Sequence, residues 1–141
     1  MSATNKNNIF IDTNVLIGAW SGKKPDSNCL DYLFSLTGKR LFISSLSVAQ
    51  LVSVFQKKKN NAEIKKIVRY LLSKFTVLSF TDKDIEDSLN IENSDMEDNI
   101  QYIISRKFNC LHFVTNNKKD YNRFYILNII MPSQIRVIKR D

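Results

Sequence analysis

Short apolar runs alternate with segments of helical periodicity along this chain, and this alternation restricts its fold more than any other feature. The runs at 8–12, 40–44, 75–80 and 110–115 have the length and the β-branched or aromatic content of buried strands. The segments between them repeat apolar residues every three or four positions, which is typical of amphipathic helices. Strands alternating with helices predict an α/β fold with a parallel sheet covered on both faces.

Caps and chain breakers predict where the helices begin and end. Thr13 or Asn14 is expected to cap a helix that runs through Trp20, and a loop is expected at 22–26 because it holds Gly22 and Pro25. A short final strand is expected at 135–138 after Pro132. Further helices are expected at about 29–36, 46–55, 64–72, 82–91, 95–108 and 118–130.

The chain has 141 residues, which predicts one domain over 1–141. No apolar run reaches the roughly 18 residues that a membrane span needs, and residues 1–8 are polar, so we expect a cytoplasmic protein without membrane contact. Cys29 and Cys110 are expected to be core thiols. With these two cysteines and one histidine, His112, the chain does not have the composition of a structural zinc site.

The formal net charge is +7, and the charges are segregated along the chain. One helical region is basic, with Lys57, Lys58, Lys59, Lys65, Lys66, Arg69 and Lys74. The region after it is acidic, with Asp82, Asp84, Glu86, Asp87, Glu92, Asp95, Glu97 and Asp98. Each block alone is typical of a solvated helix face. Together they suit a surface that binds phosphates beside a pocket that binds cations.

The first strand ends on Asp12, where open α/β sheets place their chemistry. Asp95 and Asp98 are three positions apart at a helix start, so both can face the same way. Asn117 and Asp120 follow the fourth strand, whose end could lie beside that of the first. Carboxylates that converge would repel each other without a cation, and Mg²⁺ and Mn²⁺ prefer oxygen ligands. Such an ion can activate water and neutralise charge on a phosphate.

Other catalytic arrangements are not supported. The chain has no Walker loop and no glycine-rich dinucleotide turn. A Ser-His-Asp hydrolase would need His112, which lies inside an apolar strand and is interpreted as a strand residue. A response-regulator-like domain would have paired acids before its first strand and a late lysine at a strand end, and neither is present.

Four segments carry the polar and acidic residues at the predicted strand ends and helix starts: IFIDTNVLIGAW at 9–20, SSLSVAQL at 44–51, DMEDNIQYIIS at 95–105 and FVTNNKKDY at 113–121. Together, in this order and spacing, they resemble the PIN-domain family, in particular its VapC-like toxin branch. The resemblance implies a three-layer α/β/α sandwich around a parallel sheet of four to five strands. It also implies a Mg²⁺- or Mn²⁺-dependent ribonuclease, with RNA as substrate, an antitoxin protein as partner and a homodimer as the usual assembly.

Matching the motifs residue by residue implies the site. Asp12 and Asp98 correspond to family acids, Asp95 is a neighbouring helper, and Asp120 matches the acid after the fourth strand, so the resemblance implies catalytic roles for these four residues. Metal binding is expected from Asp12, Asp98, Asp95 and Asn117. Supporting polar groups are Thr13, Asn14, Gln50 and Thr115. RNA contacts are expected from Lys57, Lys58, Lys59, Lys118 and Lys119.

Two positions depart from the family pattern. Gln50 stands where the family has a Glu, and Asn117 stands where many members have an Asp. Each keeps an oxygen ligand but loses a negative charge, which should weaken metal binding. The resemblance therefore implies a metal-dependent endoribonuclease, and the departures leave open a catalytically weak or inactive PIN-fold module that binds RNA or protein.

Overall fold

The computed structural model describes residues 4–92, 95–122, 124 and 127–140, and within these the central sheet has five parallel strands in the order β3-β2-β1-β4-β5. The strands are β1 (Asn5–Ile11), β2 (Arg40–Ser44), β3 (Thr76–Leu78), β4 (Cys110–Val114) and β5 (Asn128–Ile130). The predicted α/β fold with a parallel sheet is confirmed.

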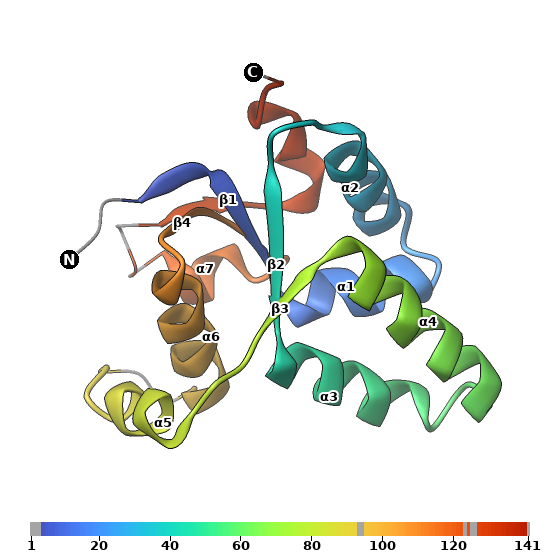
Figure 1. Ribbon diagram of the computed structural model, residues 1–141, viewed down its shortest axis with the longest axis horizontal. Helices are drawn as coiled ribbons and strands as arrows, with labels where there is room; N and C mark the ends of the chain where they lie inside the picture. The colour runs from blue at the N-terminus through green and yellow to red at the C-terminus, as the bar shows by residue number, and fades with distance from the viewer. Residues whose placement is uncertain (1–3, 93–94, 123, 125–126, 141) are drawn as a thin grey trace.

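Helices cover both faces of the sheet and give the expected three layers (Figure 1). One face carries α1 (Thr13–Trp20), α2 (Lys24–Ser35), α3 (Ser45–Phe55) and α4 (Asn61–Lys74). The other carries α6 (Met96–Lys107) and the short α7 (Lys118–Tyr121), with α5 (Asp82–Ser88) packed beside α6. A 3₁₀ helix, η1 (Pro132–Val137), closes the chain against α2.

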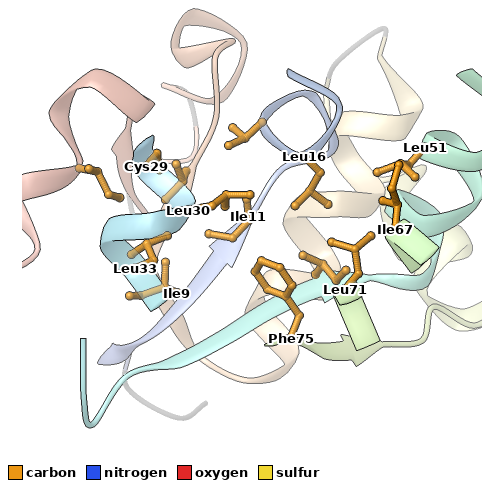
Figure 2. Packing of buried hydrophobic residues seen from close by; sticks show 14 of the residues in the cluster. Ile9, Ile11, Leu16, Cys29, Leu30, Leu33, Leu51, Ile67, Leu71 and Phe75 are labelled. Atoms are coloured by element: carbon orange, nitrogen blue, oxygen red, sulfur yellow. The ribbon is translucent and has the colours of Figure 1, made fainter. Parts of the chain in front are cut away.

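The central strand β1 is buried on both sides, and its alternating side chains divide the core in two. Ile9 and Ile11 are fully buried among residues of α1 to α4, as Figure 2 shows. Phe10, between them, lies in the second cluster and stacks on Phe113 with ring centroids 5.1 Å apart. Successive side chains of a strand point to opposite faces, so the continuous apolar run of β1 serves both layers.

The secondary-structure prediction was wrong in three segments, two of which follow or contain a proline. The helix expected at 118–130 ends at Tyr121 as α7, and Asn128–Ile130 forms β5 beside β4 (residues 123, 125 and 126 lie outside the described part). The strand expected at 135–138 is largely η1. The loop expected at 22–26 already contains the start of α2 at Lys24.

These errors have physical reasons. Pro132 and Pro25 both occupy the first turn of a helix, where a missing N–H costs nothing and the fixed φ suits the helix. Ile129 and Ile130 belong to a short apolar run of β-branched residues, and periodicity alone cannot show whether such a run is a helix or a strand. Their pairing with Phe113 and Val114 decides the strand.

Two smaller expectations concern the cysteines and the membrane. Cys29 and Cys110 are buried free thiols, as predicted. In the described part of the chain, no helix is long and apolar enough to cross a membrane.

The strand order reverses between β1 and β4. The chain runs outward from β1 through β2 to β3, then returns to the other side of β1 to form β4 and β5. Open α/β sheets bind ligands at such a switch point, outside the carboxyl ends of the strands. The fold therefore directs attention to the residues that follow Ile11 and Val114.

Candidate active site

Asp12 and Thr115 are the first residues beyond β1 and β4, and they meet at the switch point. The Thr115 hydroxyl donates to Asp12 Oδ2 at 2.8 Å, and the Asp12 backbone N–H donates to the Val114 carbonyl at 2.9 Å. The prediction that the ends of the first and fourth strands lie side by side is thus confirmed.

The Asp12 carboxylate is buried and held by three donors. Its Oδ1 accepts from the Thr13 backbone N–H at 2.8 Å, so Asp12, rather than Thr13 or Asn14, caps helix α1. The Asn14 side-chain amide donates to Oδ2 at 3.3 Å, alongside the Thr115 hydroxyl. Asn14 also accepts from the Asn116 backbone N–H, which ties the loop after β4 to α1.

Burial raises the pKa of Asp12 from 3.8 to about 6. The hydrogen bonds from Thr115 and the Thr13 backbone oppose this rise, whereas the nearby charge of Asp98 adds to it. In the metal-free pocket the ionised carboxylate is therefore disfavoured despite three donors. A cation that approaches it would remove this penalty.

Asp98, in the first turn of α6, faces Asp12 across a shared tyrosine. The Tyr121 hydroxyl donates to Asp98 Oδ1 at 2.9 Å and also lowers the pKa of Asp12. Burial and the charges of Asp12 and Asp98 raise the pKa of Tyr121, so the phenol stays protonated and remains a donor. Asp95 has a different contact, because its side chain caps α6 by accepting from the Asp98 backbone N–H at 3.1 Å.

A pocket of about 520 Å³ opens at this edge of the sheet. It is lined by the four predicted metal-binding residues, Asp12, Asp95, Asp98 and Asn117. The predicted polar residues Thr13, Asn14 and Gln50 also line it, and Thr115 lies fully buried beneath, bonded to Asp12. Asp12 at the end of β1, residues of α1, α3 and α6, and Asn117 of the β4–α7 loop therefore surround one pocket.

Below the pocket lies a buried polar network that the sequence did not reveal. The Gln101 side-chain amide donates to Thr13 Oγ1 at 3.1 Å and to Ser47 Oγ at 2.8 Å, and its carbonyl accepts from the Ser44 hydroxyl at 2.7 Å. Thr13 in turn bonds Gln50 Oε1 at 2.6 Å. The helical spacing of Asp98 and Gln101, three residues apart, was the available signal for Gln101.

Two further pocket contacts were not singled out from sequence. Glu97 lines the pocket, and its carboxylate accepts a hydrogen bond from the Gln50 amide. Tyr121 makes the second contact, because its hydroxyl donates to the pocket residue Asp98. Both contacts join residues far apart in sequence, so local patterns could not predict them.

Other predicted residues lie outside the pocket lining. Asp120 is exposed on α7, and its catalytic role stays a prediction. Lys57 and Lys58 are exposed just beyond the C-terminal end of α3, and the Lys59 ammonium lies 5.1 Å from the Phe55 ring centroid. Lys118 and Lys119 lie on α7.

The chemistry of the pocket's side chains suits a hard divalent cation, since Asp12, Asp98 and Asn117 offer only oxygen ligands. Among residues 4–92, 95–122, 124 and 127–140, however, no three His, Cys, Asp or Glu side chains converge closely enough to form a metal cluster. The pocket thus suits a divalent cation for two reasons: its side chains offer oxygen ligands, and a cation would offset the energetic cost of the buried Asp12 charge.

Comparison with known proteins adds a family and a fold. A model of the PIN domain matches residues 8–119. Ribonuclease VapC1 of Aquifex aeolicus (strain VF5) is 22% identical over 134 residues, which cover 84% of this chain and 87% of that relative.

Solved structures have the same architecture. A chain in a toxin–antitoxin complex from Klebsiella pneumoniae superposes with a TM-score of 0.67 at 19% identity, over 88% of this chain and 97% of that one. A chain of VapBC2 from Rickettsia felis, bound to a DNA fragment from their promoter, has a TM-score of 0.64 at 20% identity, over 88% and 98%. At these identities the structures establish a shared fold.

Proposed function

The chain belongs to the PIN-domain family, and on that premise we propose that it is a metal-dependent endoribonuclease, the toxin of a toxin–antitoxin pair. One observation carries this proposal above the others. The buried Asp12 carboxylate faces Asp98 in an oxygen-lined pocket at the switch point of the sheet. Related chains named as a VapC ribonuclease and as members of toxin–antitoxin complexes support the activity and an antitoxin partner.

The proposed divalent ion, Mg²⁺ or Mn²⁺, would be held by Asp12, Asp98 and the Asn117 side-chain oxygen, with Asp95 as a further carboxylate at the pocket. When bound, such an ion activates water and neutralises charge on the phosphate under attack.

The chain's own residues prepare the pocket for this role. Thr115, Asn14 and the Thr13 backbone hold the Asp12 carboxylate in one orientation. The Tyr121 hydroxyl donates to Asp98 and also lowers the pKa of Asp12, which opposes the effect of the Asp98 charge on Asp12. Preorganised ligands need little rearrangement at the moment of reaction, which is the main contribution a protein makes to phosphoryl chemistry.

Lysines near the pocket would bind the RNA backbone. Lys57, Lys58 and Lys59 follow the C-terminal end of α3, the helix that contributes Gln50 to the pocket, and Lys118 and Lys119 follow the pocket residue Asn117. Ammonium groups bind phosphates without regard to sequence, so they would position RNA rather than select it. A cytoplasmic location, as expected from the sequence, agrees with an RNA substrate. The homodimer remains a prediction, to be tested by sedimentation.

The test is RNA cleavage by purified protein freed of any antitoxin. We expect cleavage with Mg²⁺ or Mn²⁺, none with EDTA, and at least a hundredfold slower cleavage by Asp12→Asn, since one essential charge is lost. Asp31→Asn, which alters an exposed carboxylate on α2, is the matched control and should cleave as the wild type does. Cleavage that is insensitive to Asp12→Asn would refute the assigned site.

A second function is favoured by one observation, the neutral Gln50 and Asn117 in the pocket lining. They reduce the negative charge available to a cation, as expected of a PIN-fold module that binds RNA or protein without cutting. Wild-type protein that binds RNA but does not cleave it at any Mg²⁺ or Mn²⁺ concentration would support this alternative.

A further inference from the structure

The orientation of the Gln50 side chain is determined by its two partners. Its Oε1 lies 2.6 Å from the Thr13 hydroxyl, and its Nε2 contacts a carboxylate oxygen of Glu97. An ionised carboxylate only accepts hydrogen bonds, so the amide must present its N–H₂ to Glu97. The opposite amide orientation would set two acceptor oxygens against each other.

The buried network fixes the other end of the amide. Gln101 uses both of its N–H donors on Thr13 and Ser47, while Ser44 supplies the hydrogen to its carbonyl. Thr13 accepts from Gln101, and its hydroxyl lies 2.7 Å from Ser47 Oγ and 2.6 Å from Gln50 Oε1. Ser47 can donate to Thr13, whereas an amide oxygen only accepts, so the Thr13 hydrogen is assigned to Gln50 Oε1. Thr13 and Gln101 are 7% and 2% exposed, so solvent does not compete for these bonds.

Glu97 is therefore held at the pocket by a side chain that is itself anchored. Glu97 is exposed in the first turn of α6, where an acidic side chain ordinarily extends into water. Here it reaches across to Gln50, 47 positions away in the sequence, and lines the pocket with Asp12 and Asp98.

We propose that Glu97 is a fourth carboxylate of this pocket, beside Asp12, Asp95 and Asp98, that Gln50 holds it there, and that its negative charge strengthens the binding of the divalent cation. The inference rests on the proposed function only in assigning that cation to the pocket. The inference also gives the neutral Gln50 a role in metal binding. Gln50 and Glu97 are paired in the pocket lining, and the pair carries one negative charge. That charge comes from Glu97 on α6, whereas a Glu at position 50 would have supplied it from α3.

Glu97 acts through its charge and its contact with Gln50, so direct coordination is not required. This role is compatible with the lack of a three-acid cluster among the residues that the structure describes. Side chains that support a metal site without coordinating the ion typically change its affinity 10- to 100-fold when removed.

The test measures Mn²⁺ binding by isothermal titration calorimetry on the full chain, without RNA. Glu97→Gln should weaken Mn²⁺ binding roughly tenfold. Glu92→Gln, which removes an exposed acid close in sequence but outside the pocket lining, is the matched control and should bind within twofold of wild type. The double variant Gln50→Glu/Glu97→Gln exchanges the two groups and should restore affinity to within about threefold of the wild type.

Each outcome decides the matter. Unchanged affinity in Glu97→Gln, a double variant as weak as Glu97→Gln, or a wild type that binds no Mn²⁺ would overturn the inference. The proposed function fails differently: a wild type that binds Mn²⁺ through Asp12 but cleaves no RNA would reject catalysis and leave the role of Glu97 intact.

Discussion

Asp12 serves two roles that conflict energetically. As the cap of α1 it stabilises the fold through the Thr13 backbone N–H, and as a buried carboxylate beside Asp98 it carries a charge that the metal-free pocket disfavours. Residues kept for function often cost stability in this way.

The raised pKa of Asp12 predicts how metal-free stability depends on pH. The pKa of Asp12 is about 6 in the folded state and 3.8 ordinarily, so the folded state binds the Asp12 proton more tightly than the unfolded state does. The contribution of protonated Asp12 to the free energy of unfolding is therefore fully present below pH 3.8 and is lost as pH rises through 6. The gap between these pKa values corresponds to roughly 3 kcal/mol. Asp12→Asn should abolish this dependence and raise the free energy of unfolding at pH 7.5 by about 1–2 kcal/mol, since some hydrogen bonds are lost.

Denaturant unfolding in EDTA at pH 4 and pH 7.5 measures this effect, with Asp31→Asn as the exposed-carboxylate control. Added Mn²⁺ should stabilise the wild type but not Asp12→Asn, because a ligand stabilises only the state that binds it. An Asp12→Asn variant less stable than the wild type at pH 7.5 would show that the hydrogen bonds outweigh the buried charge.

At the scale of elements, the start of α3 couples helix stability to the pocket floor. Ser44 is the last residue of β2, and its Oγ caps α3 by accepting from the Ser47 backbone N–H at 2.9 Å. The same hydroxyl donates to Gln101 on α6, so one side chain joins a strand end and two helices. Loss of Ser44 would disturb both the cap and the network that anchors Gln50.

Ser44→Ala should therefore lower the free energy of unfolding by about 2–3 kcal/mol, because it removes a cap and leaves the buried Gln101 carbonyl without its donor. Asn60→Ala removes the cap of α4, an exposed site, and should cost only about 1 kcal/mol. Denaturant unfolding of both variants measures the difference. Equal losses would mean that the Ser44–Gln101 bond adds nothing beyond the cap.

At the scale of the whole molecule, the sheet order and the charge distribution act together. The switch between β1 and β4 gathers acids at one edge, and the net charge of +7 is carried by lysines and arginines elsewhere. The positive net charge would attract a polyanion such as RNA to the protein surface. The acids of the pocket would repel a phosphate unless a bound cation neutralises their charge.

The salt dependence of RNA binding tests this distribution. In EDTA and in an Asp12→Asn background, Lys57→Ala/Lys58→Ala should reduce the slope of log affinity against log salt by about 1.4, since each single-stranded phosphate contact contributes about 0.7. Lys23→Ala/Lys24→Ala, at the start of α2, is the matched control. Filter binding from low to high salt measures the slopes, and equal slopes in both double variants would exclude a specific role for Lys57 and Lys58.

Much of the fold and part of the site could be predicted because their signals are local. The run at 9–11 ending on Asp12 shows both a buried strand and its terminal acid, and the spacing of Asp95 and Asp98 places both acids at the start of α6. Short ambiguous segments such as 128–130 were assigned wrongly, since their state depends on pairing with β4 rather than on their own pattern.

By itself the sequence determined the alternation of strands and helices, the burial of β1 and the identity of its terminal acid, because each follows from periodicity within a few residues. Only the tertiary structure decided that Tyr121 bonds Asp98, that Gln101 supports Thr13 and that Gln50 holds Glu97 at the pocket. These contacts join side chains 23, 88 and 47 positions apart. Their partners are set by the packing of helices around the switch point, which no local pattern encodes.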